Sequence, residues 1–375
     1  MEFEIDRTEF LEGLRLTQGV VERRNTLPIL SNVLIEPAER GISVLATDLD
    51  IGVRRSCQAK VKGSGAMTVN ARKLFELVKE VQGASIRFKS LENHRVEVVS
   101  GKARWNLVGL DPKDFPSIPG LSGKPAKGAS EIRAKAAELS SMIESTLFAV
   151  SLDETRINLS GVYVENHDGA VRMVATDGHR LAMIDRKIDG SVPEKGAILP
   201  RKGLMEAKKL LESGDVPDED AVTLWIDGSI AKIVRGHAEL FMRLIEGDFP
   251  DYRQVIPKSS KAKISLSRAD FLHALGCASV VSSERAKGVR ISVKSGVLEV
   301  QASNPDLGEG SYETEIAYNG DELSIGFNGR YLIEALTAMG DGDRVEFLAS
   351  DDVSPGILRP EGDDSYCYVV MPMRL

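Results

Sequence analysis

The sequence has few of the features that mark secreted, metal-binding or membrane-spanning proteins. Its 375 residues include three cysteines, Cys57, Cys277 and Cys367, which lie far apart and form no Cys-x-x-Cys pair. We expect all three to be buried free thiols in a reducing cytoplasm. There is no run of about 18 apolar residues, and the first ten residues lack the basic flank and apolar stretch of a secretion signal. These absences argue against disulfide scaffolds, membrane spans and export.

Histidine and aromatic residues are also scarce. The five histidines show no spacing typical of metal ligands, and aromatic residues make up 5% of the chain. No Gly-x-Ser-x-Gly, Walker or His-Glu-x-x-His motif is present. The sequence therefore predicts no metal and no cofactor. The net charge of −8 disfavours a protein that simply coats nucleic acid, and the acidic residues concentrate in two expected surface turns, 212–220 and 351–364.

What the sequence does contain is an internal repeat. Two stretches rich in proline and glycine, 111–128 and 247–263, can carry neither a helix nor a central strand. These two stretches divide the chain into three pieces, and the three pieces resemble one another in sequence. The sequence therefore predicts three similar domains, at residues 1–125, 126–255 and 256–375.

Several matched residues recur along the chain at a nearly constant spacing of about 129 residues. Thr47 and Thr176 lie 129 residues apart, each in an Ala-Thr-Asp sequence that follows an alternating apolar stretch. Each piece opens with a helical pattern whose matched apolar residues are Phe10, Leu139 and Phe271. A second helical pattern in each piece begins at an arginine, and these arginines, at steps of 129 residues, are Arg72, Arg201 and Arg330. An internal repeat of this kind determines the fold assignment, because a prediction that overlooks it assigns the wrong fold.

The segments between the helices alternate apolar and polar residues, as half-buried strands do. Residues 221–236 are predicted to form a hairpin with Asp-Gly at its tip. The predicted fold class is therefore α+β, with three repeated domains that each consist of an antiparallel sheet and two helices on one face.

The segment Ala175–Met183, with the sequence ATDGHRLAM, could be mistaken for a catalytic loop. An enzyme such as a hydrolase could use His179 as a base oriented by Asp177, with Arg180 holding an anion. The sister copies read ATDLD and ASNPD and have no histidine, so what recurs is a short polar residue suited to a turn. Three equivalent domains are also unusual for an enzyme with one unpartnered dyad. We interpret Asp177 as a turn residue and the loop as a binding surface.

The three helices that begin at arginine each have one apolar stripe and one polar stripe. A cation near a helix N-terminus is disfavoured by ~0.3–1 kcal/mol, so its recurrence in three copies favours a facing polyanion over a merely solvated helix. This observation also argues against a peptide-binding scaffold with no role on DNA. Three such domains in an arc, and two chains in a ring, would bring the basic helices together on the inside.

The sequence resembles the bacterial DNA polymerase III beta subunit family, the sliding clamps, over its whole length. The resemblance is carried by TLPILSNVLIE (26–36), ATDGHRLA (175–182), LPRKG (199–203), DFPDYRQVIP (248–257) and YVVMPMRL (368–375). It implies a head-to-tail dimeric ring of six domains that encircles double-stranded DNA and has no chemistry or cofactor of its own. The implied partners are the DNA polymerase III catalytic subunit, the clamp loader, and other polymerases and repair proteins that carry clamp-binding peptides.

The resemblance also assigns residues to three surfaces. DNA contacts are expected at Arg24, Arg72, Lys73, Arg201 and Lys202. A dimer interface is expected at Phe75, Trp105, Val280 and Val281. A partner-peptide groove is expected at Arg156, Leu159, Thr176, Gly178, His179, Arg180, Leu181, Pro250, Val255, Val353, Val370, Met371, Pro372, Met373, Arg374 and Leu375. The chain departs from the best-known enterobacterial member at Leu152, Asp153 and Asn158 near the DNA, and at Gln254 and Pro355 near the groove.

Overall fold

The computed structural model describes residues 1–21, 27–118, 128–214, 221–283, 287–340 and 342–375. Contacts divide the chain into two compact units. The first contains Met1–Ser140, Asp189–Pro193 and Lys202–Leu244, and the second contains Ser141–Ile188, Glu194–Arg201 and Ile245–Leu375. Each unit therefore contains part of the central third of the sequence. Among the described residues, no helix is long and apolar enough to cross a membrane.

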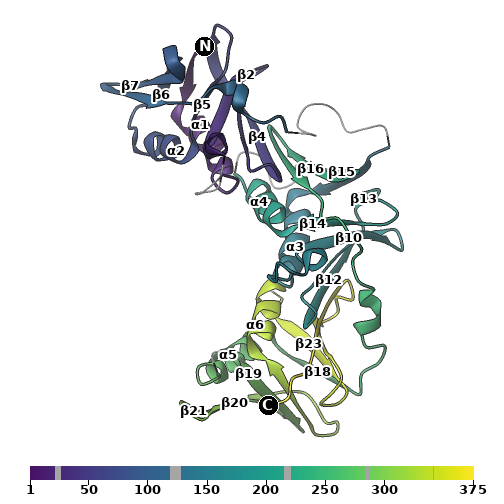
Figure 1. Cartoon of the computed structure of the whole chain (residues 1–375). Coiled ribbons are helices and arrows are strands. Elements are labelled where there is room, and N and C mark those ends of the chain that lie inside the picture. Colours follow the sequence, from purple (N-terminus) through teal and green to yellow (C-terminus); the bar gives the residue numbers. More distant parts are fainter. Residues whose placement is uncertain (22–26, 119–127, 215–220, 284–286, 341) are drawn as a thin grey trace. The chain divides into compact units, whose positions relative to one another are not determined.

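The described elements repeat one order three times (Figure 1). The first third contains β1 (Glu2–Asp6), α1 (Arg7–Thr17), β2 (Asn32–Ala38), β3 (Gly41–Thr47), β4 (Ile51–Lys62), β5 (Met67–Asn70), α2 (Ala71–Glu80), β6 (Ser85–Ser90), β7 (Arg95–Ser100) and β8 (Ala103–Val108). The central third contains β9 (Ser130–Lys135), α3 (Ala136–Leu147), β10 (Gly161–His167), β11 (Ala170–Thr176), β12 (Arg180–Arg186), β13 (Asp189–Gly190), β14 (Ala197–Pro200), α4 (Arg201–Leu211), β15 (Ala221–Asp227), β16 (Ile230–Arg235) and β17 (Ala238–Arg243). The last third contains β18 (Ala262–Ser267), α5 (Arg268–Ser279), β19 (Gly288–Lys294), β20 (Val297–Asn304), β21 (Gly308–Glu315), β22 (Leu323–Asn328), α6 (Gly329–Ala338), β23 (Arg344–Ala349), β24 (Gly356–Pro360) and β25 (Tyr366–Val370).

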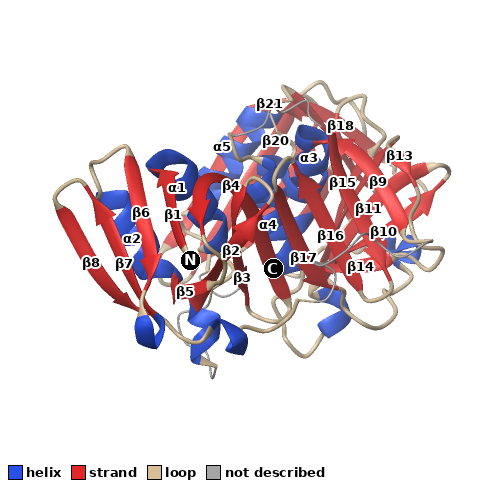
Figure 2. Cartoon of the chain, turned by 90° about the horizontal axis from the view of Figure 1, so that it is seen from above, coloured by secondary structure: helices blue, strands red, loops and turns tan. Residues whose placement is uncertain are grey.

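The helices begin where short polar side chains cap them. Asp6 accepts hydrogen bonds from two backbone N–H groups of α1, and Asn70 accepts one from Lys73 in α2. Ser267 and Asn328 cap α5 and α6 in the same way. Each of these caps ends a strand, so the chain turns directly from sheet into helix. α1 lies beside α2 (Figures 1 and 2), and α5 lies beside α6 (Figure 1). The apolar stripes of these helices are buried.

One antiparallel sheet runs through the first unit in the order β13-β9-β15-β16-β17-β4-β1-β6-β7-β8, with β2, β3 and β5 attached through β4. The first half of β4 pairs with β17, so Gly52 lies opposite Phe241 and Val53 opposite Leu240. β4 comes from the first third of the chain and β17 from the central third. The sheet therefore crosses the expected boundary between these two domains.

The second unit repeats this junction. Its larger sheet has the order β14-β10-β11-β12-β25-β24-β23-β18, and β12 of the central third pairs with β25 of the last third. A smaller sheet, β21-β20-β19-β22, lies in the last third. The described strand pairs of these sheets are antiparallel, which confirms the predicted fold class of sheet plus helices in three domains.

The predicted hairpin is present as β15 and β16, but Asp227 ends β15 and pairs with Ile230, so the turn consists of Gly228 and Ser229, one residue later than expected. The prediction for the cysteines was partly wrong. All three are free, but only Cys57 is buried, while Cys277 is exposed on α5 and Cys367 is half-buried. Apolar and small residues occur on both faces of α5, among them Ala269 and Cys277 on the exposed one, so sequence periodicity does not separate its two faces clearly. The expected domain boundary at residues 125 and 126 lies outside the described residues.

Candidate functional site

The turn between β11 and β12 is built by its own polar side chains. The carboxylate of Asp177 accepts hydrogen bonds from the backbone N–H groups of His179 and Arg180, at 2.9 and 3.1 Å. Thr176 accepts one from the N–H of Gly178, which has a φ of 88° that favours glycine. Asp177 thus holds the backbone rather than the imidazole of His179. The turn interpretation of Asp177 accounts for the geometry, and the catalytic one does not.

A mostly apolar cavity of about 270 Å³ opens beside this turn. It lies entirely in the second unit. Its walls come from the turn, the β25 end and the segment after β17, and its lining residues are Leu159, Thr176, Gly178, Arg180, Leu181, Pro250, Asp251, Tyr252, Val255, Val369 and Met371. Hereafter we call this cavity the groove. Its size and apolar walls suit a few side chains of a bound ligand.

The expected groove residues fall into three sets. Eight of the residues expected there line the cavity: Leu159, Thr176, Gly178, Arg180, Leu181, Pro250, Val255 and Met371. Arg156 and His179 lie at its edge, where Arg156 donates to the carbonyl of Asp177 and the carbonyl of His179 accepts from Met371. Val353 is exposed, Val370 is buried in β25, and Pro372, Met373, Arg374 and Leu375 continue away from the lining.

One wall of the groove is a 3₁₀ turn, Tyr252–Val255, that is anchored on the sheet by a buried hydroxyl. The hydroxyl of Tyr252 donates to Glu165 and accepts from Arg172 at 3.1 Å. Arg172 also makes a two-point ion pair with Asp185, with both bonds at 2.6 Å. Burial, followed by the hydrogen bond with Glu165, raises the pKa of Tyr252 to about 12, so the phenol stays protonated at neutral pH.

Arg180 forms the opposite wall and is almost fully buried. Its guanidinium lies between the rings of Phe148 and Tyr331, 5.4 and 4.2 Å from their centroids. It donates to Glu334 on α6 at 2.5 Å, to the carbonyl of Phe148 at 2.7 Å and to Asp177 at 3.1 Å. Burial alone would raise the pKa of Glu334, but hydrogen bonds from Arg180 and Arg330 outweigh it and lower that pKa. Arg180 therefore joins the β11–β12 turn to the last third of the chain.

Sequence reasoning missed Phe148, Tyr252, Tyr331 and Glu334. Tyr252 lies within one of the stretches that carry the family resemblance, so it could have been proposed. Phe148 directly follows α3, and Tyr331 and Glu334 both lie on α6, and no spacing in the sequence connects them with the turn.

The residues expected to contact DNA differ in whether their positive charge is already paired with a carboxylate of the chain. Arg72 and Lys73 both pair with Glu76 on α2, and Arg330 pairs with Glu334 on α6. These i,i+4 pairs offset the unfavourable position of the arginines, which weakens the argument from the helix dipole. Lys202 pairs with the buried carboxylate of Asp48 at 2.5 Å. Arg201 is exposed and makes no ion pair within the described part of the chain, and Arg24 lies outside the described residues.

The residues expected at a dimer interface lie on open surfaces of the single chain. Val280 is 77% exposed just after α5, and Val281 lies against the edge strand β21 at Gly310. Trp105 is half-buried on the edge strand β8. Phe75 is half-buried on α2 and lines a cavity of about 500 Å³ together with Gln18 and Val21, which follow α1.

Comparisons with known proteins agree along the whole chain. Models of the DNA polymerase III beta subunit match residues 1–119 for its N-terminal domain, 133–251 for its central domain and 253–374 for its C-terminal domain. The chain belongs to the bacterial beta sliding clamp family. It is 34% identical to the beta sliding clamp of Pseudomonas aeruginosa and 35% identical to that of Caulobacter vibrioides, with 100% of each chain covered. A crystal structure of the DnaN sliding clamp from Bartonella birtlesii bound to griselimycin superposes with a TM-score of 0.92 at 34% identity, with full coverage of both chains.

Membership of the sliding clamp family settles the general function. The chain is a processivity factor rather than an enzyme: it binds DNA, assembles with itself and tethers polymerase through a peptide-binding groove. This excludes the hydrolase alternative. Within the described residues, no group of three or more His, Cys, Asp or Glu side chains is placed to hold a metal ion.

Proposed function

We propose that two copies of this chain close head to tail into a ring of six domains around double-stranded DNA. One observation carries the proposal: the chain already contains two strand junctions of one kind, β4 with β17 and β12 with β25. The strand that corresponds to β4 and β12 in the last third is β21, and the strand that corresponds to β17 and β25 in the first third is β8. Both are edge strands among the described residues. Pairing of β21 with β8 of a second copy repeats the junction and, made twice, closes the ring.

The repeat also predicts the register of this pairing. Val53, Ala182 and Gly310 are matched, because each lies opposite the alanine that precedes the Thr or Ser of the turn. At the two internal junctions the partners of Val53 and Ala182 are Leu240 and Tyr368. The corresponding residue of β8 is Trp105, so its indole would lie over Gly310 of the other copy. A large ring opposite a glycine is a favourable cross-strand pair.

The helices support the same seam. Within the first unit, the carboxylate of Glu206 on α4 lies directly against Gly19 after α1. The positions that correspond to Gly19 and Glu206 are Val280 in the last third and Leu77 in the first. At the seam between copies, two apolar residues therefore replace the glycine and the glutamate. Burial of the exposed Val280 in this way, together with Val281 and Phe75, would stabilise the dimer.

DNA would contact the α2, α4 and α6 helices. Arg201 would make the strongest contact, because no carboxylate of the described residues pairs with its guanidinium. Arg72 and Lys73 would exchange Glu76 for phosphate. Direct contacts of this kind weaken steeply with salt, whereas a closed ring stays on DNA by topology. Retention and sliding are thereby separated, as processive synthesis requires. We place this activity in the cytoplasm, at the nucleoid during replication.

The groove would bind short peptides of the polymerase III catalytic subunit, the clamp loader, and other polymerases and repair proteins in turn. Met371 on its rim suits such exchange, since a flexible thioether adapts to different apolar ligands. We expect the same groove to bind griselimycin.

A loading experiment tests the ring. The protein is loaded on nicked circular DNA by a clamp loader, and the protein–DNA complex is isolated by gel filtration. The DNA is then linearised, and the protein that stays bound is measured. We expect retention that is lost when the circle is cut. Retention that survives cutting would show direct binding and contradict the ring.

A further inference from the structure

The last five residues leave β25 and are held at two points. The N–H of Met371 donates to the carbonyl of His179 in the β11–β12 turn at 2.9 Å. Two residues later, the N–H of Met373 donates to the carbonyl of Gly326 on β22 at 2.8 Å. The tail thus joins the wall of the groove to the smaller sheet of the second unit.

Two glycines of that sheet leave room for the end of the tail. Gly288 on β19 pairs with Asn328, so Gly326 on β22 is its diagonal neighbour on the same face. A Cβ atom on Gly288 would lie 2.3 Å from the Cδ2 atom of Leu375. A Cβ atom on Gly326 would lie 2.4 Å from the carbonyl oxygen of Met373 and 2.8 Å from the Cγ atom of Leu375. A side chain at either position would therefore force the tail to move: the Leu375 side chain at Gly288, and the backbone of Met373 at Gly326.

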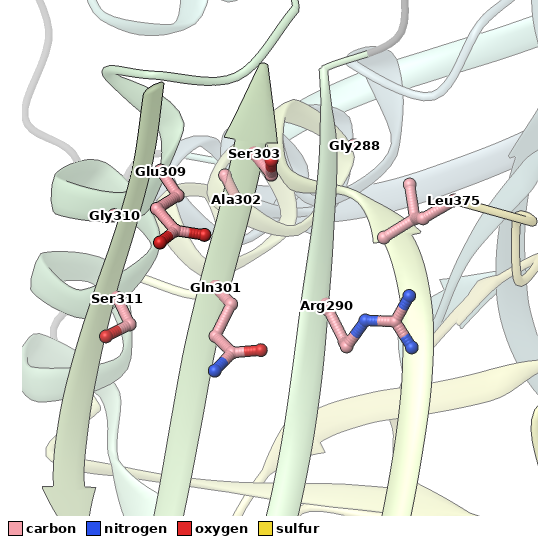
Figure 3. A pocket seen from close by; sticks show the side chains of 9 residues that line it. All are labelled: Gly288, Arg290, Gln301, Ala302, Ser303, Glu309, Gly310, Ser311 and Leu375. Atoms are coloured by element: carbon pink, nitrogen blue, oxygen red, sulfur yellow. The ribbon is translucent and has the colours of Figure 1, made fainter. Parts of the chain in front are cut away.

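Figure 3 shows the Leu375 side chain beside Gly288, at one end of a cavity of about 540 Å³ over the outer face of β19, β20 and β21. The side chains that line the rest of this cavity are polar, among them Arg290, Gln301 and Ser311. Leu375 is 55% exposed, so its apolar contacts are concentrated on the side of the two glycines. The glycines provide the part of this face that a leucine can approach closely.

We propose that Gly288 and Gly326 form a seat for Leu375, and that this seat fixes the tail so that Met371 is positioned in the wall of the groove. Met371 lines the groove and is 40% exposed, so nothing else covers it fully. A seated tail is ordered when the protein folds, whereas a free tail would have to be ordered when a ligand binds. The two glycines and Leu375 are therefore positioning residues for ligand binding, although they do not line the groove. This inference rests on the function proposed for the groove.

Griselimycin, titrated into the purified full-length chain by calorimetry, serves as the probe. We expect Gly288→Ala and Gly326→Ala each to raise its dissociation constant by about five- to tenfold, because the added methyl group displaces the tail. Leu375→Ala should have a similar effect. The double variant Gly288→Ala with Leu375→Ala should bind no more weakly than the weaker of its two single variants, since both changes remove the same contact. Additive losses would contradict a shared seat.

Ser324→Ala is the matched control, because Ser324 lies one pleat from Gly326 on the same face of β22 and pairs with Ser292 rather than with the tail. It should bind griselimycin as the wild type does. Thermal unfolding of all variants should stay close to that of the wild type, since the tail lies outside the core. A glycine variant that binds weakly only because it has unfolded would be recognised by this measurement.

A second experiment tests the seat independently of the groove. A carboxypeptidase releases Leu375, and mass spectrometry measures the rate of this release. We expect faster release in both glycine variants than in the wild type and in Ser324→Ala. Unchanged release would overturn the seat, and faster release with unchanged griselimycin affinity would overturn the positioning of Met371. A wild-type chain that fails to bind griselimycin would contradict the groove proposal and the positioning with it, while the release rates would still decide whether the seat exists.

Discussion

Arg180 is the single residue on which the groove depends most. Its guanidinium satisfies Glu334, Asp177 and the carbonyl of Phe148, and it separates two aromatic rings. We expect Arg180→Ala to lower the free energy of unfolding by about 3 kcal/mol, because it removes the donor to the carbonyl of Phe148 and a buried cation from beside the carboxylates of Asp177 and Glu334. Urea denaturation would measure this loss. Griselimycin binding should be abolished at the same time.

Arg156→Ala is the control for this prediction. Arg156 is half exposed at the edge of the same groove, and its ion pair with Asp153 is a surface pair at 3.7 Å. Its replacement should change the free energy of unfolding by less than about 0.5 kcal/mol. Equal losses in the two variants would mean that Arg180 has no special structural role.

Glu334 makes the same cluster sensitive to pH. Its pKa is lowered in the folded protein, because hydrogen bonds from Arg180 and Arg330 outweigh the effect of burial. A carboxyl with a lowered folded pKa stabilises the protein fully above its unfolded pKa of ~4.3, and that stabilisation is lost as the pH falls through the folded value. We expect the difference in melting temperature between wild type and Glu334→Gln to be largest above about pH 5 and to shrink towards about pH 3. If the difference in melting temperature stays constant with pH, the ionisation of Glu334 does not contribute to the pH dependence of stability.

At the scale of elements, the 3₁₀ turn at Tyr252–Val255 is attached to the sheet by the buried hydroxyl of Tyr252 and by the more exposed Arg253, both of which bond to Glu165. Tyr252→Phe keeps the ring but leaves Glu165 and Arg172 without a shared partner. We expect the free energy of unfolding to fall by about 1–3 kcal/mol, the cost of buried polar groups that lose a hydrogen bond. Griselimycin affinity should fall too, because Pro250 and Val255 on either side of Tyr252 line the groove.

Tyr163→Phe is the matched change for this element. The hydroxyl of Tyr163 donates to the carbonyl of Lys195 at 3.0 Å in an exposed position, and its ring stacks on Phe249 close by. It should leave both stability and binding nearly unchanged. If it lowers both as much as Tyr252→Phe does, the anchoring role of the buried hydroxyl is wrong.

The elements themselves were largely predictable from the sequence, because three copies of one pattern reinforce one another. The matched arginines mark the starts of α2, α4 and α6, and the Asp-Gly sequence marks the turn of the β15–β16 hairpin to within one residue. Contacts between elements were less predictable. Lys202 was expected at DNA, yet it pairs with Asp48, which is 154 residues away along the chain. An ion pair of this kind depends on how a turn and a helix meet, and residue periodicity carries no information about that.

At the scale of the whole molecule, the seam between copies decides whether a ring exists. We expect the double change Val280→Asp and Val281→Asp to give a monomer of 40.8 kDa, because two carboxylates would be buried against apolar residues of the other copy. Sedimentation velocity would distinguish it from a dimer of twice that mass. Leu152→Asp is the control, since Leu152 is 74% exposed and Val280 is 77% exposed, but Leu152 is not expected at the seam. A double variant that still sediments as a dimer would place the seam elsewhere.

The sheets that cross the domain boundaries have a consequence for how such a chain can evolve or be engineered. Three repeats of one sequence pattern suggest segments that could be exchanged or removed one at a time. Here the central segment places β17 in one sheet and β12 in another, so excising residues 126–255 would break two strand ladders at once. The exposed edges would favour aggregation. Sequence repeats and compact structural units are therefore out of phase in this chain, and residues that face each other across a junction come from neighbouring copies of the repeat.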